Sequence, residues 1–237
     1  SSALTRQRFS RAQTSGALSA TSQFSCVFQG RNKKVVQEVR LQSADVVDSG
    51  LEWQIGAYYT NESYNRSSTD SLIDLPTQQP TTASTSGTIA DYEEKAAFAN
   101  ATYYFSPAFD IAAGLRYSHN EQAGIGTNNS GQFNGRSGAS SDSKVTWSVT
   151  GRYHPAEDIL LYANVSTGYR AGGPNFFAVG QAIPPEFQPE ELTNYEAGIK
   201  LSTGDKRATF TLSAFYIDWS SIQLPLIVNR LTFRGNN

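Results

Sequence analysis

Between Ile159 and Trp219, apolar and polar residues alternate with a period of two over successive short segments. In the first of these segments Leu161 and Val165 fall on one face, whereas Asn164 falls on the other. Successive side chains of a β-strand point to opposite faces of a sheet, so this pattern predicts strands that are apolar on one face and polar on the other. The region is therefore expected to form an antiparallel sheet.

The same alternation recurs along most of the 237-residue chain. An all-β meander of about eight or nine strands is expected, the least clear of them at residues 23–29. The clearer strands are predicted at residues 35–43, 51–63, 94–106, 111–121, 144–154, 159–170, 191–202 and 207–219.

The connections between the predicted strands alternate between short and long. In an antiparallel barrel, alternate connections lie on opposite rims, and bacterial outer-membrane barrels place short turns at the periplasmic rim and long loops outside. The pattern therefore predicts an antiparallel transmembrane β-barrel wall rather than a soluble sandwich. Short links are expected at 44–50, 107–110, 155–158 and 203–206, and long polar loops at about 64–90, 122–142 and 171–190.

Composition narrows the class further. The mean hydropathy is −0.42, and no stretch approaches the roughly 18 apolar residues of a membrane helix. This excludes helical membrane proteins but not barrels, in which only every second residue faces lipid. The net charge of −2 and the dispersed basic residues give no support to a nucleic-acid partner. One basic cluster, Arg31 with Lys33 and Lys34, is interpreted as a solvated turn.

Catalytic and metal sites find no support in the sequence. The two histidines, His119 and His154, lie near a long loop and at a tight turn, without a nucleophile and acid in a recognisable arrangement. Cys26 is the only cysteine, which excludes an internal disulfide framework and a cysteine-rich metal site. We therefore expect no enzyme activity, no catalytic residues, no metal and no cofactor.

Aromatic residues cluster near the predicted strand ends. Those that share the lipid-facing register are expected to form interfacial girdles, where an amphipathic ring lies at headgroup level. The aromatic residues considered are Tyr58, Tyr59, Tyr103, Tyr104, Phe105, Tyr117, Tyr153, Tyr169 and Tyr216.

Three motifs carry a family resemblance: S-T-G-Y-R-A-G-G-P-N at 166–175, F-Q-P-E-E-L-T-N-Y-E-A-G-I-K at 187–200, and A-F-Y-I-D-W at 214–219. Together with Q-E-V-R-L-Q-S at 37–43, they resemble the C-terminal barrel of TonB-dependent outer-membrane receptors. The resemblance implies a 22-stranded barrel in the outer membrane of a Gram-negative bacterium, blocked by an N-terminal plug. It also implies TonB-energised uptake, with TonB, ExbB and ExbD as partners, of a scarce nutrient such as a ferric siderophore.

The sequence departs from the family pattern in lacking a recognisable plug, a TonB box and the last strands. Residues 35–237 are therefore interpreted as part of the barrel, and residues 1–34 as a loop with one possible strand. The absence of an initiator methionine is consistent with a processed chain or a fragment. Two alternatives stay open: a self-contained small outer-membrane barrel with a structural or adhesive role, and an outer-membrane hydrolase.

Ligand contacts are expected from inward-facing residues near the outer rim and from the long loops. Arginine suits anionic ferric chelates through charge-assisted hydrogen bonds, and aromatic rings suit the planar or apolar parts of a ligand. The residues that meet these conditions are Tyr64, Arg66, Arg136, Arg170, Asn175, Phe176 and Phe177.

Overall fold

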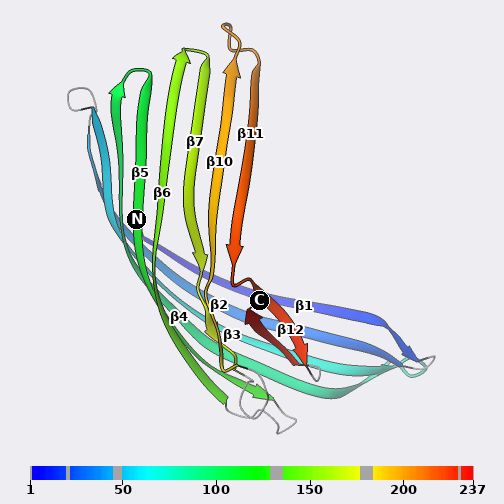
Figure 1. Cartoon of the computed structure of the whole chain (residues 1–237). Helices are drawn as coiled ribbons and strands as arrows, with labels where there is room; N and C mark the ends of the chain where they lie inside the picture. The colour runs from blue at the N-terminus through cyan, green and yellow to red at the C-terminus, as the bar shows by residue number, and fades with distance from the viewer. Residues whose placement is uncertain are drawn as a thin grey trace.

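The computed structural model describes residues 2–19, 22–44, 50–128, 136–176, 184–228 and 231–236. The described chain forms one curved, nine-stranded antiparallel sheet in the order β1-β2-β3-β4-β5-β6-β7-β10-β11, with two small two-stranded sheets beside it (Figure 1). The all-β antiparallel fold predicted from the alternation is confirmed. The large sheet comprises β1 (Ser2–Ser19), β2 (Ser22–Gln42), β3 (Leu51–Asp74), β4 (Gln79–Ser106), β5 (Phe109–Asn128), β6 (Arg136–Ala156), β7 (Ile159–Arg170), β10 (Glu190–Ser202) and β11 (Thr209–Ser220).

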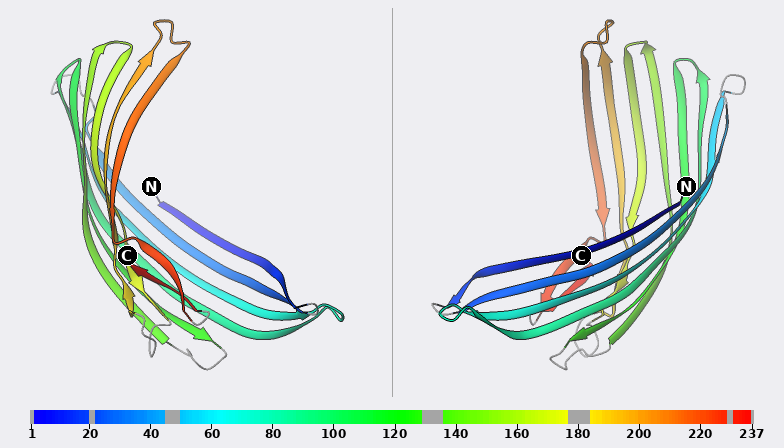
Figure 2. Two further views of the ribbon diagram at one scale, coloured as in Figure 1. Left: turned by 45° about the vertical axis from the view of Figure 1, so that its right-hand side comes forward. Right: turned by 180° about the vertical axis from the view of Figure 1, so that it is seen from behind.

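The two small sheets lie on the concave side of the large one, which we call the inner face (Figure 2). The first pairs β8 (Gly173–Pro174) with β9 (Glu186–Phe187), and the second pairs β12 (Gln223–Val228) with β13 (Leu231–Asn236). Between β11 and β12 the backbone of Ser221 has a φ of 53°, in the left-handed region. This turn directs the β12–β13 hairpin back over the inner face instead of continuing the wall.

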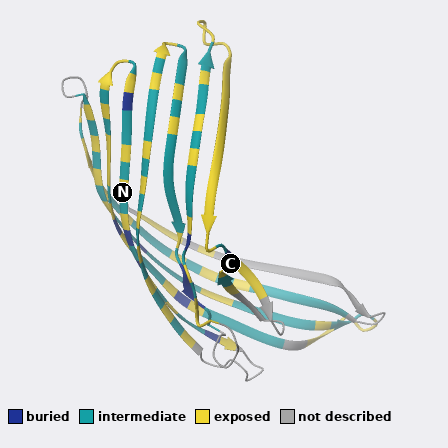
Figure 3. Cartoon of the chain, viewed as in Figure 1, coloured by how far each residue is buried: buried dark blue, intermediate teal, exposed yellow. Residues whose placement is uncertain are grey.

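Apolar side chains occupy the outer face of the sheet. On β3, Trp53 and Ile55 point outward and are exposed, Ile55 by 48%, whereas the adjacent Glu52 and Gln54 point inward and are less exposed. Figure 3 shows this alternation as yellow and teal bands along the strands. A sheet with its apolar side chains outside and its polar ones inside is suited to lipid on one face and a hydrated lumen on the other.

The outward apolar band has the height of a membrane. On β4 it runs over residues 97–105 and on β5 over residues 109–117, close to the 9–11 residues of a transmembrane strand. At the short-turn end of the band the ring of Phe105 lies 4.7 Å from that of Tyr103 and 5.4 Å from that of Phe109. Tyr103 and Phe105 were among the residues expected in an interfacial girdle, which stays a prediction, and Phe109 was not. No helix among the described residues is long and apolar enough to cross a membrane.

Charged and polar side chains pair with one another across the inner face. Arg116 donates to Glu94 over 2.6 Å, and Arg152 donates to Asp110 over 2.6 Å. Tyr104 is also on this face, where its hydroxyl donates to Glu52, so it is not part of the outer girdle. Only those aromatic residues whose register places them on the outer face can therefore belong to the girdle.

The strands extend much further than the sequence pattern predicts. β3 and β4 remain paired as far as Asp74 and Gln79, so most of the predicted loop at 64–90 is a long hairpin. β5 and β6 likewise pair as far as Gly126 and Arg136, within the predicted loop at 122–142. Both loop predictions were wrong because they relied on composition. A backbone ladder needs no apolar side chains, and threonine favours strands.

The N-terminal region also differs from the prediction. Residues 1–34 were interpreted as a loop with one possible strand, but β1 pairs with β2 from Ser2 to Ser19 in an extended antiparallel register. The basic cluster of Arg31, Lys33 and Lys34 lies inside β2 and not in a turn. Cross-strand hydrogen bonding again outweighs the weak side-chain pattern.

Candidate ligand pocket

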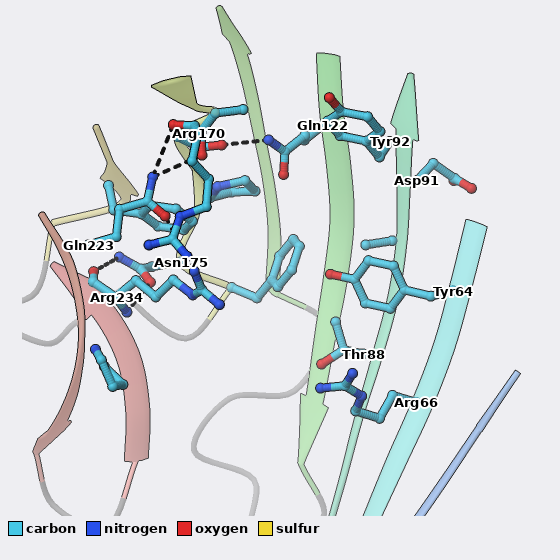
Figure 4. Close-up of a pocket in the computed structure, with 17 residues that line it drawn as sticks. Tyr64, Arg66, Thr88, Asp91, Tyr92, Gln122, Arg170, Asn175, Gln223 and Arg234 are labelled. Carbon is cyan, nitrogen blue, oxygen red and sulfur yellow. Dashed lines mark hydrogen bonds between the residues drawn. The ribbon is translucent and has the colours of Figure 1, made fainter. Parts of the chain in front are cut away.

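A pocket of about 530 Å³ opens on the inner face, at the end of the sheet opposite the short turns (Figure 4). One wall is formed by the long extensions of β3, β4 and β5. The other is formed by the connection between β7 and β10 and by the β12–β13 hairpin. The lining residues are Tyr64, Arg66, Thr88, Ala90, Asp91, Tyr92, Gln122, Arg170, Ala171, Gly172, Pro174, Asn175, Phe176, Phe187, Gln223, Pro225 and Arg234.

Two glycines let the β7–β10 connection approach the sheet. Gly124 on β5 and Gly138 on β6 are directly paired across the ladder. A Cβ on Gly138 would lie 2.7 Å from the Cβ of Pro174, and one on Gly124 would lie 2.7 Å from the ring of Phe176. The missing side chains therefore make room for Pro174 and Phe176 against the inner face.

Gln223 joins three segments at the rim of the pocket. Its side-chain amide donates to the carbonyl oxygens of Ala171 over 2.9 Å and of Gln188 over 3.1 Å, and its backbone N–H donates to Glu190 over 2.8 Å. The residue is only 6% exposed. A buried amide whose donors and acceptor are all used fixes its surroundings, because each broken bond would leave an unsatisfied polar group.

Asn175 and Arg234 provide a second connection between the same segments. The backbone N–H of Arg234 donates to Oδ1 of Asn175 over 3.0 Å, and Nδ2 of Asn175 donates to the Arg234 carbonyl over 2.8 Å. The guanidinium of Arg234 lies 5.7 Å from the ring centre of Phe187 and donates to Oε1 of Gln223 over 3.3 Å. The hairpin is thus held by both side-chain and backbone hydrogen bonds.

The charge of the pocket is predominantly positive. Arg66, Arg170 and Arg234 line it, together with Asp91. Nη2 of Arg170 lies 2.7 Å from Oε1 of Glu190, whose side chain is only 8% exposed. Anions that enter the pocket would meet guanidinium groups whose planar donor pattern matches carboxylates.

Two pKa shifts follow from this arrangement. Burial alone would raise the pKa of Glu190, but the hydrogen bond from the Gln223 N–H and the contact with Arg170 outweigh it and hold that pKa below its usual value. Burial raises the pKa of the Tyr64 hydroxyl, although Arg66 and Arg234 oppose the rise. Glu190 is therefore ionised, and Tyr64 is a neutral donor, at neutral pH.

The structure brings most of the predicted ligand residues together. Tyr64 and Arg66 come from β3, Arg170 ends β7, and Asn175 and Phe176 follow β8, yet all of them line this one pocket. The side chain of Arg136 and the whole of Phe177 lie outside the described residues.

Sequence reasoning missed Gln223, Arg234, Phe187 and Gln122, all of which line the pocket. Phe187 lies within one of the motifs and could have been chosen for its place in a long connection. The other three carry no local signal, because their importance comes from partners far away in the chain. Among the described residues there is no cluster of histidine, cysteine and acidic side chains that could hold a metal ion.

Comparison with known proteins identifies the family. Residues 2–234 match the family model described as TonB dependent receptor-like, β-barrel. The chain belongs to the TonB-dependent receptor family. The family assignment based on the three motifs is therefore confirmed, and the nine-stranded sheet is part of such a receptor's wall.

The curated proteins that this chain resembles are receptors by name. The pesticin receptor of Yersinia pestis is 30% identical over 228 residues, which cover 94% of this chain and 31% of that protein. The metal-pseudopaline receptor CntO of Pseudomonas aeruginosa is 32% identical over 114 residues, covering 48% of this chain and 15% of the relative. The chain thus spans about a third of the length of the pesticin receptor, and its match to CntO spans a smaller share of that protein.

Solved receptors share the fold. The crystal structure of the ferric yersiniabactin uptake receptor FyuA from Yersinia pestis superposes with a TM-score of 0.80 at 24% identity, covering 99% of this chain and 34% of FyuA. The unliganded ferric citrate transporter FecA superposes with a TM-score of 0.58 at 15% identity, covering 91% of this chain and 34% of FecA. At these identities the likeness concerns the fold alone.

Proposed function

We propose that this chain forms part of the wall of an outer-membrane receptor that takes up a ferric siderophore or a similar anionic iron chelate, driven by TonB. The observation that carries the proposal is the inner-face pocket, where Arg66, Arg170 and Arg234 converge from three separate segments. A chelate with carboxylate or phenolate groups carries negative charge, which guanidinium groups bind through short, paired hydrogen bonds. Phe176 and Phe187 add aromatic surface for the organic part of the ligand.

The relatives support an iron chelate as cargo. Ferric yersiniabactin and ferric citrate appear in the names of two structural neighbours, and metal-pseudopaline in that of a curated relative. The partners follow from the family: lipid around the outer face, the chelate outside the cell, and TonB with ExbB and ExbD through a plug and TonB box in the same receptor. The cellular location is the outer membrane of a Gram-negative bacterium.

The open sheet favours a large receptor over a self-contained small barrel. Within the described residues, β1 and β11 are the terminal strands of the large sheet. Each would expose unpaired backbone groups to lipid, which is energetically prohibitive. Further strands of a longer receptor satisfy both edges. The other alternative, an outer-membrane hydrolase, gains no support from the family match, because the matching family model describes a receptor.

The test uses the full-length receptor that contains this chain, expressed in a strain that lacks its own copy. Purified receptor is titrated with ferric yersiniabactin and ferric citrate, and uptake of radioactive iron is followed in cells. The double variant Arg66→Gln/Arg170→Gln should lose at least about tenfold in affinity, because two charged contacts are removed. Arg207→Gln, at the short-turn rim, is the matched control. If the double variant binds and transports both chelates like the control, the pocket is not the chelate site.

A further inference from the structure

The basic cluster at residues 31–34 is divided between the two faces of β2. Lys34 points inward, where its Nζ lies 3.2 Å from Oε2 of Glu62. Arg31 and Lys33 are exposed on the outer face, and within the described part of the chain neither takes part in an ion pair. Two positive charges are therefore presented outward, away from the lumen and the ligand pocket.

These two residues lie at the border of the apolar band. On β2 the outward positions are Leu41, Val39, the polar Gln37 and Val35, and the next outward residue is Lys33. β1 repeats the pattern at the directly paired positions. Leu4, which is 62% exposed, pairs with Val35, and the next pair in the same register is Arg6 with Lys33. Arg8 pairs in turn with Arg31.

On β4 and β5 the residues at this border lie beside acids. The first outward residue beyond the band is Lys95 on β4, which pairs with Glu93 over 2.6 Å, and His119 on β5, which lies 3.3 Å from Glu121. At the opposite border, by contrast, the band ends in the aromatic rings of Phe105 and Phe109. One border of the lipid-facing band therefore carries charged side chains, among which Arg31 and Lys33 are the pair on β2, and the other border carries aromatic rings.

Nearby acids do not neutralise the pair on β2. On β3 the outward residues paired with Lys33 and Arg31 are Ser63 and Asn65, which are uncharged. The next outward residue in this row is Asp91 on β4, two strands and about 10 Å away. Glu93 lies one outward position further toward the band and already has two partners. It accepts a hydrogen bond from the Tyr59 hydroxyl over 3.0 Å and forms an ion pair with Lys95 over 2.6 Å.

We propose that Arg31 and Lys33 form a site for the phosphate groups of membrane lipid headgroups. Long basic side chains at the border of a lipid-facing surface extend their alkyl stems along the apolar band and place their charges at headgroup level. Clusters of lysine and arginine in this position attract anionic lipid. The site lies on the outer face and depends on the membrane location in the proposed function, not on the identity of the transported chelate.

The test measures lipid binding to the full-length receptor in a neutral detergent. Native mass spectrometry is used with diphosphoryl lipid A as the first probe, phosphatidylglycerol as the second and zwitterionic phosphatidylcholine as the reference. The variant is Arg31→Gln/Lys33→Gln, with Lys33→Gln alone as the milder change. Lys34→Gln is the matched control, because it removes the same charge one residue away on the opposite face.

The double variant should bind diphosphoryl lipid A about tenfold more weakly, and the single variant should lie between it and the wild type. Circular dichroism verifies that each variant is folded. An equal loss for phosphatidylglycerol would assign the site to lipid phosphate in general, and a loss confined to lipid A would assign it to the glycolipid. Unchanged binding in the double variant, or an equal loss in Lys34→Gln, would overturn the proposal. Iron uptake is measured separately and should not change, so failure of the lipid site and failure of the chelate pocket are distinguishable.

Discussion

The side-chain amide of Gln223 donates to the carbonyl oxygen of Ala171 over 2.9 Å, across 52 residues of sequence. This bond attaches the start of β12 to the segment that follows β7, and the backbone bond from Gln223 to Glu190 attaches the same point to the start of β10. One buried side chain thus sets how the hairpin covers the pocket.

Replacing Gln223 by leucine should release the hairpin from the wall. The change leaves the carbonyls of Ala171 and Gln188 without their donor, at a cost of about 1–3 kcal/mol for buried groups. Hydrogen exchange at residues 184–190 and 223–228 should become faster, while exchange in the β4–β5 ladder should not change. Gln79→Leu, at an exposed position, is the control. Identical exchange in the two variants would show that Gln223 does not hold the hairpin.

Low pH should weaken the attachment of the β12–β13 hairpin to the wall, because it protonates Glu190, which accepts the hydrogen bond from the Gln223 N–H. Because its pKa is held below the ordinary value near 4.5, this carboxylate stabilises the folded state fully above that value. The contribution is lost as the pH falls through the lower pKa of the folded state. Proteolysis of the β12–β13 hairpin in the intact receptor should therefore accelerate below pH 4.5. Glu190→Gln should remove most of this pH dependence, and an unchanged pH profile in that variant would exclude Glu190 as the titrating group.

The absence of a side chain at Gly138, which pairs with Gly124, should also affect how tightly the pocket binds a chelate. In Gly138→Ala, the new Cβ would lie 2.7 Å from the Cβ of Pro174, so the β7–β10 connection must shift. Chelate affinity should fall, with little effect on the amount of receptor inserted in the membrane. Gly151→Ala is the matched control, because a Cβ there meets nothing within 4 Å. Equal affinities for the two variants would mean that the position of Pro174 does not matter for binding.

The period-two pattern predicted the strands of the large sheet well, because these strands place apolar residues on the outer face and polar residues on the inner face. It placed Leu161 and Val165 together; Leu161 is exposed, and Val165 pairs with the exposed Val149 of β6. The pattern could not predict the long extensions of β3 and β4, where the backbone ladder continues without apolar side chains. Nor could it predict the return of the hairpin at Ser221, since periodicity carries no information on where a strand reverses.

Part of the candidate site was predictable for a different reason. Residues that end a strand at the long-loop rim must face the same region of space, which brought Arg170 and Asn175 into the prediction together. Gln223 and Arg234 could not be found this way, because their partners are distant in sequence and belong to a hairpin with no alternation of its own. Such residues become visible only when tertiary contacts are known.

The assignment of the outer face to lipid can be tested by moving one charge across the sheet. Ala99 points outward in the middle of the apolar band, and its neighbour Asn100 points inward, where its amide donates to Gln54. Ala99→Arg places a guanidinium in the centre of the bilayer and should lower the free energy of unfolding by about 2–4 kcal/mol. Asn100→Arg places the same group in the hydrated lumen and should cost less. The measurement is urea unfolding of the full-length receptor in lipid vesicles, followed by tryptophan fluorescence. Equal losses for both variants, or a larger loss for Asn100→Arg, would mean that the band over residues 97–105 does not face the lipid.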